Sequence, residues 1–288
     1  MAALAESWVA LSIAAFLVWS VSAFLPKLAV QSLSPFEVLV YSTLGCLAFV
    51  PVLFLFSAIA MAWSPAGIFW AAISGVFGML AQLFYIFALR DGKSSVVFIV
   101  TALYPIVAAA FAFFILKEQP SAFQYAGIAL ALAALVLVVG GETSGEQVAG
   151  KGRVWLWHCF WAFLFFGLWA FFPKLALQTL SAGDVLIYEQ IGNVAVMLGV
   201  LAWLKGRVGV SRRGVSLAFC GGFVAMGGVF LYFTALHLGP VSTVTTLSAL
   251  YPVGSVLLAR LILKEHIRSR QYAGMAFAMG AIALMASG

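Results

Sequence analysis

The stretch LPKLAVQSLS at residues 25–34 returns 147 positions later as FPKLALQTLS at residues 172–181. Aligned without a gap, 25–45 and 172–192 are identical at 11 of 21 positions. Apolar composition alone can produce scattered matches, but it does not place Pro, Lys and Gln at one constant offset. The chain is therefore a duplication of one unit, and its architecture follows from that unit.

The same offset holds through the rest of the chain. It pairs Tyr85 with Tyr232, and it pairs three further segments: TALYP at 101–105 with SALYP at 248–252, ILKE at 115–118 with ILKE at 262–265, and QYAG at 124–127 with QYAG at 271–274. A Gly-rich segment of mixed charge at 140–153 is typical of a flexible linker. We divide the chain into a first repeat at 1–146, which includes the start of this linker, and a second at 147–288.

The composition excludes a water-soluble globule. Of the 288 residues 65% are hydrophobic and 8% charged, whereas roughly a quarter of a soluble domain is charged. With roughly 20 apolar residues per span, the apolar runs predict an all-α membrane protein, since strands of outer-membrane barrels alternate at every residue. We expect ten transmembrane helices at 8–30, 36–60, 66–90, 94–116, 121–140, 154–177, 183–204, 214–237, 240–263 and 269–287.

Five spans per repeat is an odd number, so the second repeat begins on the opposite side of the bilayer. Such inverted repeats are typical of secondary transporters. Of the 15 Lys and Arg, 13 fall on the side opposite the N-terminus, and only Lys117 and Lys174 fall on the other. The positive-inside rule then predicts that both termini lie outside the cytoplasm. It also explains the net charge of +6 without a nucleic-acid partner.

The repeated segments resemble the ten-helix EamA-type members of the drug/metabolite transporter superfamily, over essentially the whole chain. In both halves the order is Tyr, Ala-Leu, Gly, Leu-Tyr-Pro, Lys-Glu and Gln-x-x-Gly, at 85–127 and 232–274. The resemblance implies a basket of helices around a central cavity, lined by spans 1, 3, 4, 6, 8 and 9, with spans 5 and 10 at the periphery. It also implies export or exchange of small metabolites, prominently amino acids. Many members keep both termini in the cytoplasm, the reverse of what the charges here predict.

Polar groups inside the spans indicate where the substrate binds, because such groups are costly in hydrocarbon. Span 9 is the least apolar of the predicted spans. Because Pro252 in this span has no backbone N–H, a carbonyl about one turn earlier, near Ser248, loses its helical hydrogen bond. Thr101 to Pro105 repeat this pattern in span 4, and two interrupted helices at equivalent positions are typical of a mid-membrane site. The alternative is that Ser and Thr only join helices and Pro only bends them. We predict these substrate-binding residues: Trp19, Gln82, Tyr85, Thr101, Tyr104, His158, Trp161, Trp169, Tyr232, Thr245, Ser248 and Tyr251.

Among the acidic residues, Glu189 lies clearly inside a span. Glu189 and His158 are candidate proton-sensitive groups. The alternatives are that Glu189 is shallow, reaching the headgroups or pairing with Lys174, and that His158 joins two helices by a hydrogen bond. Lys117-Glu118 and Lys264-Glu265 end spans 4 and 9 and have the position of anchors and caps. Gly227 and Gly228 in span 8 are expected to allow close helix packing, so that Leu at either should abolish transport.

The sequence therefore predicts a monomeric, multi-pass transporter of the bacterial inner membrane. It would export or exchange small metabolites by alternating access, amino acids including aromatic ones being favoured. Nucleotide-sugar or sugar-phosphate exchange is a second hypothesis, which calls for Lys or Arg in the cavity, and a non-transporting scaffold is a third. An enzyme is not expected because HExxH, G-x-S-x-G and paired membrane carboxylates are absent from the sequence. We expect no cofactor or metal; the partners would be a small-molecule substrate and the lipid bilayer.

Overall fold

The computed structural model describes residues 2–29, 32–55, 60–91, 97, 100–139, 154–206, 208–263 and 268–287. These residues form helices and connecting turns, without a strand. The helices are α1 (Ala2–Ala29), α2 (Pro35–Leu55), α3 (Pro65–Asp91), α5 (Pro105–Leu116), α6 (Ala122–Val139), α7 (Val154–Ala176), α8 (Ala182–Trp203), α9 (Arg212–Leu238), α10 (Val241–Ser248), α11 (Tyr251–Leu263) and α12 (Ser269–Ser287). The linker at 140–153 and the repeated Lys264-Glu265 lie outside the described residues.

The predicted apolar runs coincide with these helices. Within the described residues, six helices are long and apolar enough to cross a membrane, as judged by length and composition, and shorter apolar helices span Trp8–Ser22, Val100–Leu116 and Ala122–Val138. Large apolar side chains such as Leu55 and Trp63 are each 82% exposed, as expected where the outer surface faces lipid rather than water. The chain is therefore a multi-pass membrane protein, and the total of ten spans stays a prediction.

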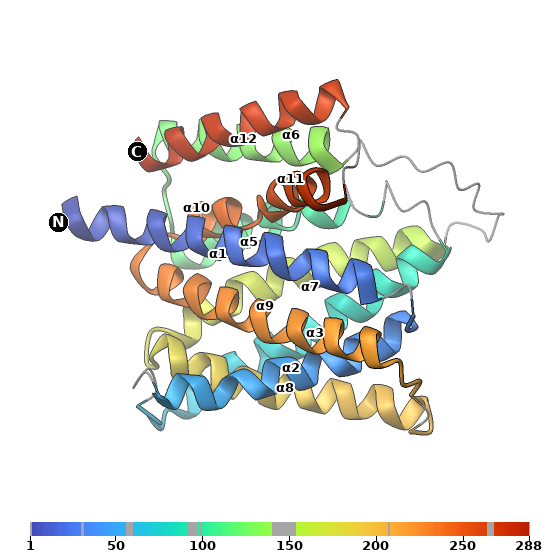
Figure 1. Ribbon diagram of the computed structural model, residues 1–288. Helices are drawn as coiled ribbons and strands as arrows, with labels where there is room; N and C mark the ends of the chain where they lie inside the picture. The colour runs from blue at the N-terminus through green and yellow to red at the C-terminus, as the bar shows by residue number, and fades with distance from the viewer. Residues whose placement is uncertain are drawn as a thin grey trace.

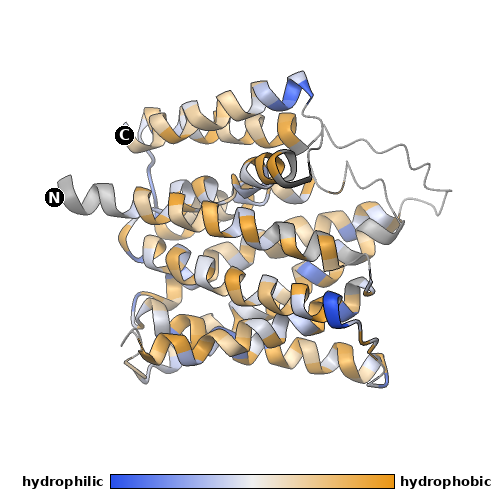
Figure 2. Cartoon of the chain, viewed as in Figure 1, coloured by the Kyte–Doolittle hydropathy of each residue, from blue (hydrophilic) through white to orange (hydrophobic). Residues whose placement is uncertain are grey.

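The helices lie side by side, with both termini at the same end of the bundle (Figure 1). The pair α6 and α12 forms one edge and the pair α2 and α8 the opposite edge, with the remaining helices between them (Figure 1). Figure 2 shows that hydrophobic residues predominate along the helices, while the starts of α9 and α12, at the end opposite the termini, are strongly hydrophilic. These starts carry Arg212, Arg213 and Arg270, which agrees with the predicted concentration of basic residues on one side.

The most extensive contacts join helices of opposite repeats, and they come in matched pairs. Helix α1 packs on α9 as α3 packs on α7, and α2 packs on α9 as α8 packs on α3. The counterpart helices α6 and α12 pack on each other. Gln271, near the start of α12, donates to the carbonyl of Val138, near the end of α6, at 3.2 Å, so these counterparts run antiparallel. The two repeats are therefore related by a two-fold axis that crosses the helices, as expected for an inverted duplication.

Pairs of glycines show this symmetry at the level of single residues. Gly75 lies against the backbone of Glu189, and its counterpart Gly222 lies against the backbone of Ser42. A second pair does the same, Gly45 against Phe219 and Gly192 against Ala72. Because a Cβ at any of these glycines would collide with a carbonyl oxygen of the other repeat, the helices approach backbone to backbone. Each repeat therefore packs mainly against the other rather than around a core of its own.

The connections before α3 and α9 are tied down by matched side chains. The Glu37 carboxylate at the start of α2 accepts from the backbone N–H of Gly209, and the Tyr41 hydroxyl donates to the Gly209 carbonyl at 3.0 Å. The second repeat contains the same clamp, formed by Asp184 with Met61 N–H at 2.8 Å and by Tyr188 with the Ala62 carbonyl at 3.1 Å. Carboxylates at these helix starts also interact favourably with the helix dipole.

Candidate functional site

The predicted break in span 9 and its twin in span 4 are both present. Span 9 consists of α10 and α11, with a tight turn at Ala249-Leu250, where Leu250 N–H bonds to the Leu247 carbonyl at 3.2 Å. In span 4, residues 100–102 are helical, and Leu103 N–H bonds to the Val100 carbonyl at 3.3 Å before α5 begins at Pro105. The two turns use equivalent residues of the two repeats. Every residue from Val241 to Leu250 is buried, so the least apolar span lies in the interior.

Four aromatic side chains meet beside the span 9 break, and we call Trp19, Trp169, Tyr232 and Tyr251 the central aromatic cluster. The Trp19 ring centroid lies 6.0 Å from that of Trp169 and 5.3 Å from that of Tyr232. The Trp169 and Tyr232 rings are stacked, with their centroids 5.8 Å apart, and Tyr251 meets Trp19 edge-on at 6.3 Å. Helices α1, α7, α9 and α11 each contribute one ring, so both repeats build the cluster.

Hydrogen bonds fix these rings. The Tyr232 hydroxyl donates to the Ala170 carbonyl at 2.9 Å, so the Thr245 hydroxyl, 2.8 Å away, is the donor in the other bond. The Trp19 indole N–H donates to the Ala225 carbonyl at 3.1 Å. Because the Trp19 indole N–H and the Tyr232 hydroxyl each have a hydrogen-bond partner, these two rings are held in defined positions.

Ser248 differs from these residues, because its buried hydroxyl oxygen has no hydrogen-bond partner among the described residues. Leaving a buried polar group unpaired costs about 1–3 kcal/mol. Tyr104, from the twin break, is also buried, and its ring centroid lies 6.0 Å from that of Phe166. The hydroxyl of Thr101 instead donates to the Val97 carbonyl of its own helix at 2.8 Å. Ser248 is thus a buried hydroxyl whose hydrogen-bonding capacity the described residues do not use.

The other predicted site residues lie away from the central aromatic cluster. Gln82 is exposed, and Tyr85 packs near Phe166. Trp161 is 36% exposed and, like His158, lies against Phe84. The His158 Nδ1 atom is buried without a partner in the described part of the chain, so the helix-to-helix hydrogen bond weighed for it is not seen there. The structure does not bring His158, Trp161 and Trp169 to one pocket, although they share a helical face.

Glycines explain why Trp169 reaches the centre. A Cβ at Gly78 of α3 would lie 2.7 Å from the Trp169 ring, and one at Gly228 of α9 would lie 2.5 Å from the Trp19 indole nitrogen. Trp19 and Trp169 are 150 positions apart, as are Gly78 and Gly228, which is three residues more than the repeat offset of 147. This is why the repeat alignment does not detect them. A Cβ at Gly227 would meet only Phe49, at 3.6 Å. From the sequence, Gly227 and Gly228 are expected to behave alike, but their surroundings differ.

Two charged side chains, which we call the turn latch, hold the turn between α9 and α10. The Glu118 carboxylate accepts from Val241 N–H at 2.7 Å and from the N–H and hydroxyl of Ser242 at 3.2 and 3.1 Å. The Lys174 ammonium donates to the carbonyls of Leu236 and Gly239. Glu118 is thus a helix cap, as predicted, whereas the pairing of Lys174 with Glu189 is not found because Lys174 is engaged here. Sequence reasoning identified Glu118 as a cap but not which helix it caps.

Replacing Glu118 by Gln is expected to lower the free energy of unfolding by about 1 kcal/mol, because a neutral amide interacts less with the N-terminus of α10. Thermal unfolding in detergent measures the loss. Lys117→Gln, at the exposed neighbouring residue, is the matched control and should unfold like the wild type. Equal stabilities of the two variants would contradict the capping role.

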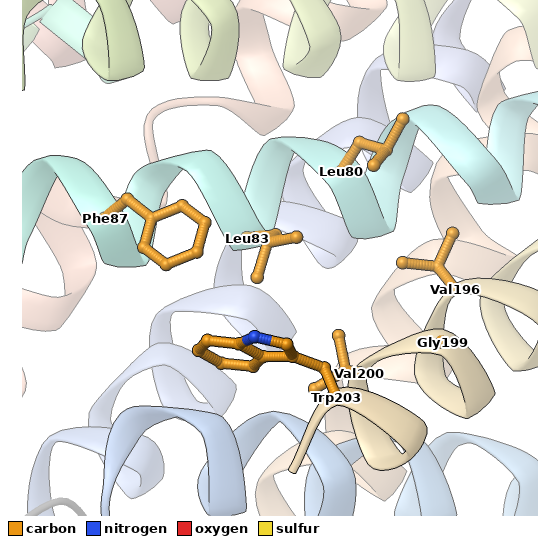
Figure 3. A pocket seen from close by; sticks show the side chains of 7 residues that line it. All are labelled: Leu80, Leu83, Phe87, Val196, Gly199, Val200 and Trp203. Carbon is orange, nitrogen blue, oxygen red and sulfur yellow. The ribbon is translucent and has the colours of Figure 1, made fainter.

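Two pockets in the described part of the chain lie outside the central aromatic cluster. One, of about 460 Å³, lies between α3 and α8 and is lined by Leu80, Leu83, Phe87, Val196, Gly199, Val200 and Trp203. Figure 3 shows apolar side chains there, with the Trp203 indole as the one polar ring, so it does not suit a polar solute. The other, of about 200 Å³, is bordered by Lys174 and His237. Neither is the predicted central cavity. The central cavity therefore stays a prediction; at the central aromatic cluster, Trp169 is only half-buried.

The comparison with known protein families detects the same two repeats. The model of the EamA-like transporter family matches residues 6–140 and again 153–287, two ranges related by the same offset of 147. A crystal structure of a protein 19% identical to this chain has the same fold, with a TM-score of 0.79 over 96% of this chain and 97% of that one. No curated protein matches the sequence.

Proposed function

The chain belongs to the EamA-like transporter family, a family of membrane transporters, and from this premise we propose that it exports or exchanges amino acids, including aromatic ones, by alternating access. The proposal places it in the bacterial inner membrane as a monomer. The observation that carries it is the central aromatic cluster beside the unpaired Ser248 hydroxyl, at the break of span 9.

The chemistry of this position suits a small amphipathic solute. Aromatic faces stack on flat or apolar side chains. The Ser248 hydroxyl can orient an amino or carboxyl group, as few convergent polar groups do in apolar binding sites. Phosphate recognition would instead call for a free Lys or Arg, and Lys174 is held by two backbone carbonyls. The arrangement therefore favours amino acids over nucleotide sugars.

The described residues are compatible with a closed step of a transport cycle. Three rings of the central aromatic cluster lie in contact, and the turn latch holds the α9–α10 turn against α5 and α7. Opening a path would require α1 to move against α9, or α3 against α7, along the Trp–Gly contacts. The two interfaces are symmetry counterparts of each other, so either could open in turn.

Counterflow in proteoliposomes tests the proposal. Vesicles loaded with unlabelled Trp, Phe, Thr or Met are expected to take up the same labelled amino acid transiently above its external concentration. Vesicles loaded with an unlabelled nucleotide sugar are not expected to accumulate the labelled nucleotide sugar. Protein-free vesicles provide the control. Exchange of nucleotide sugars without exchange of amino acids would overturn the proposed substrate class, and no exchange of either would favour a scaffold.

A further inference from the structure

Glu189 carries a buried carboxylate that takes part neither in the turn latch nor in the hydrogen bonds by which Glu37 and Asp184 hold the connections before α9 and α3. Glu189 of α8 is 2% exposed, and its Oε1 atom accepts from the Trp169 indole N–H at 2.7 Å. The Ser74 hydroxyl of α3 lies nearby and donates to the Trp169 carbonyl at 3.3 Å. Glu189 is therefore neither shallow nor paired with Lys174, the two alternatives that the sequence left open. It is instead bonded to a ring of the central aromatic cluster.

The charged and titratable groups around Glu189 provide no counterion. Nearby, α2 contributes the Cys46 thiol, which donates to the Gly222 carbonyl, and α9 the Tyr232 hydroxyl, which donates to the Ala170 carbonyl. Helix α3 presents Ser74, and on α7 the ammonium of Lys174 is bound to backbone carbonyls. On α8 itself, the Asp184 carboxylate is bonded to the backbone of the loop before α3. Among the described residues, no basic side chain is ion-paired with Glu189.

A carboxylate removed from water without a counterion is strongly unfavourable in its ionised form. In the closed, substrate-free arrangement it therefore favours holding a proton. The Trp169 bond does not prevent this, because Oε1 remains an acceptor when the proton sits on Oε2. When a solute with an ammonium group enters the cluster, its charge can take the place of the proton. Proton and solute then exclude each other at one position.

We propose that Glu189 is the proton-binding residue of this transporter, and that one proton moves through it in exchange for one molecule of substrate. The inference rests on the proposed function. The proton enters from the side to which the site is open, occupies Oε2 during closure of the empty carrier, and leaves on the other side. An ammonium-bearing substrate binds when the carboxylate has lost the proton. The coupling is thus antiport, because either partner neutralises the same carboxylate.

Glu189→Gln tests whether proton and substrate compete for this carboxylate. The carboxamide keeps an oxygen that can accept from Trp169, but it has no titratable proton. In wild-type proteoliposomes whose lumen is about one pH unit more acidic than the medium, labelled amino acid is expected to accumulate up to about tenfold, the limit for one proton per substrate. A protonophore should abolish the accumulation. Because a carboxamide cannot become the anion that the substrate ammonium neutralises, the Gln variant should lose accumulation, and its counterflow should fall strongly at every pH, whereas wild-type counterflow should fall as the pH is lowered.

Glu146→Gln, in the linker between the repeats, is the control and should accumulate substrate like the wild type. Glu189→Asp keeps a titratable group and should retain part of the accumulation. If Glu189→Gln accumulates substrate as the wild type does, or if the wild type exchanges amino acids but ignores the pH gradient, the inference is wrong. Absence of counterflow in the wild type would instead refute the proposed substrate, a different result.

Discussion

Leucine in place of Gly228 is expected to abolish counterflow while the protein still inserts into the membrane. A Cβ at this position would lie 2.5 Å from the Trp19 indole nitrogen, so the larger side chain must push Trp19 out of the central aromatic cluster. Trp19 contacts three other rings there, and its displacement changes the whole site. Overpacking of this kind typically costs about 1–3 kcal/mol, which corresponds to roughly a five- to 150-fold loss in an equilibrium constant.

The neighbouring glycine gives a matched control. Gly228→Ala should reduce counterflow about tenfold, because even one methyl group collides with the indole. Gly227→Ala introduces the same methyl group one residue away, where the nearest atom is 3.6 Å distant, and flux should stay near the wild-type value. Expression and monodispersity in detergent establish that each variant is folded. Normal counterflow by Gly228→Leu at normal expression would refute the importance of this contact.

The second large expected effect is a loss of stability, and the two-fold symmetry of the fold predicts the same loss at two equivalent glycines. Gly75→Ala and Gly222→Ala each place a methyl group into a backbone carbonyl, that of Glu189 in one case and of Ser42 in the other. A backbone cannot turn aside as a flexible side chain can, so the two helices must separate. We expect each variant to lose about 1–3 kcal/mol or more of unfolding free energy, and the two losses to be similar.

Thermal unfolding in detergent, followed by circular dichroism, measures these losses. Gly199→Ala is the control, since a Cβ there has no neighbouring atom within 4 Å; it should unfold like the wild type, or slightly later because Ala is the better helix former. If only one of Gly75→Ala and Gly222→Ala were destabilised, the two interfaces would not be equivalent, and the symmetric contact would fail as an explanation of the fold.

Much of the fold could be predicted because it depends on local properties. The helices follow from apolar runs of membrane-spanning length, and α7 and α12, for example, begin and end close to the predicted residues 154–177 and 269–287. The breaks at Leu103-Tyr104 and Ala249-Leu250 follow from the following prolines, because proline lacks the N–H that an unbroken helix needs. The inverted relation follows from the odd number of predicted spans per repeat.

The site was predictable only in part, because helical spacing places residues on a face without saying what the face meets. His158, Trp161 and Trp169 share such a face, but Phe84 of α3 fills the space beside the first two, while Gly78 admits the third. Gln82 is likewise exposed, which its spacing along the helix did not reveal. Which side chain reaches the centre is decided by a neighbour that lies far away in the sequence.

The sequence by itself determined that this is a membrane protein of two repeated halves with twin broken helices, since hydropathy, proline and a constant offset are properties of the chain alone. Only the tertiary structure decided that Trp19, Trp169, Tyr232 and Tyr251 meet, that Glu189 bonds to Trp169, and that Glu118 caps α10. The physical reason is that these contacts join helices of opposite repeats. Their partners depend on how closely glycines allow the backbones to approach, a distance that no single segment specifies.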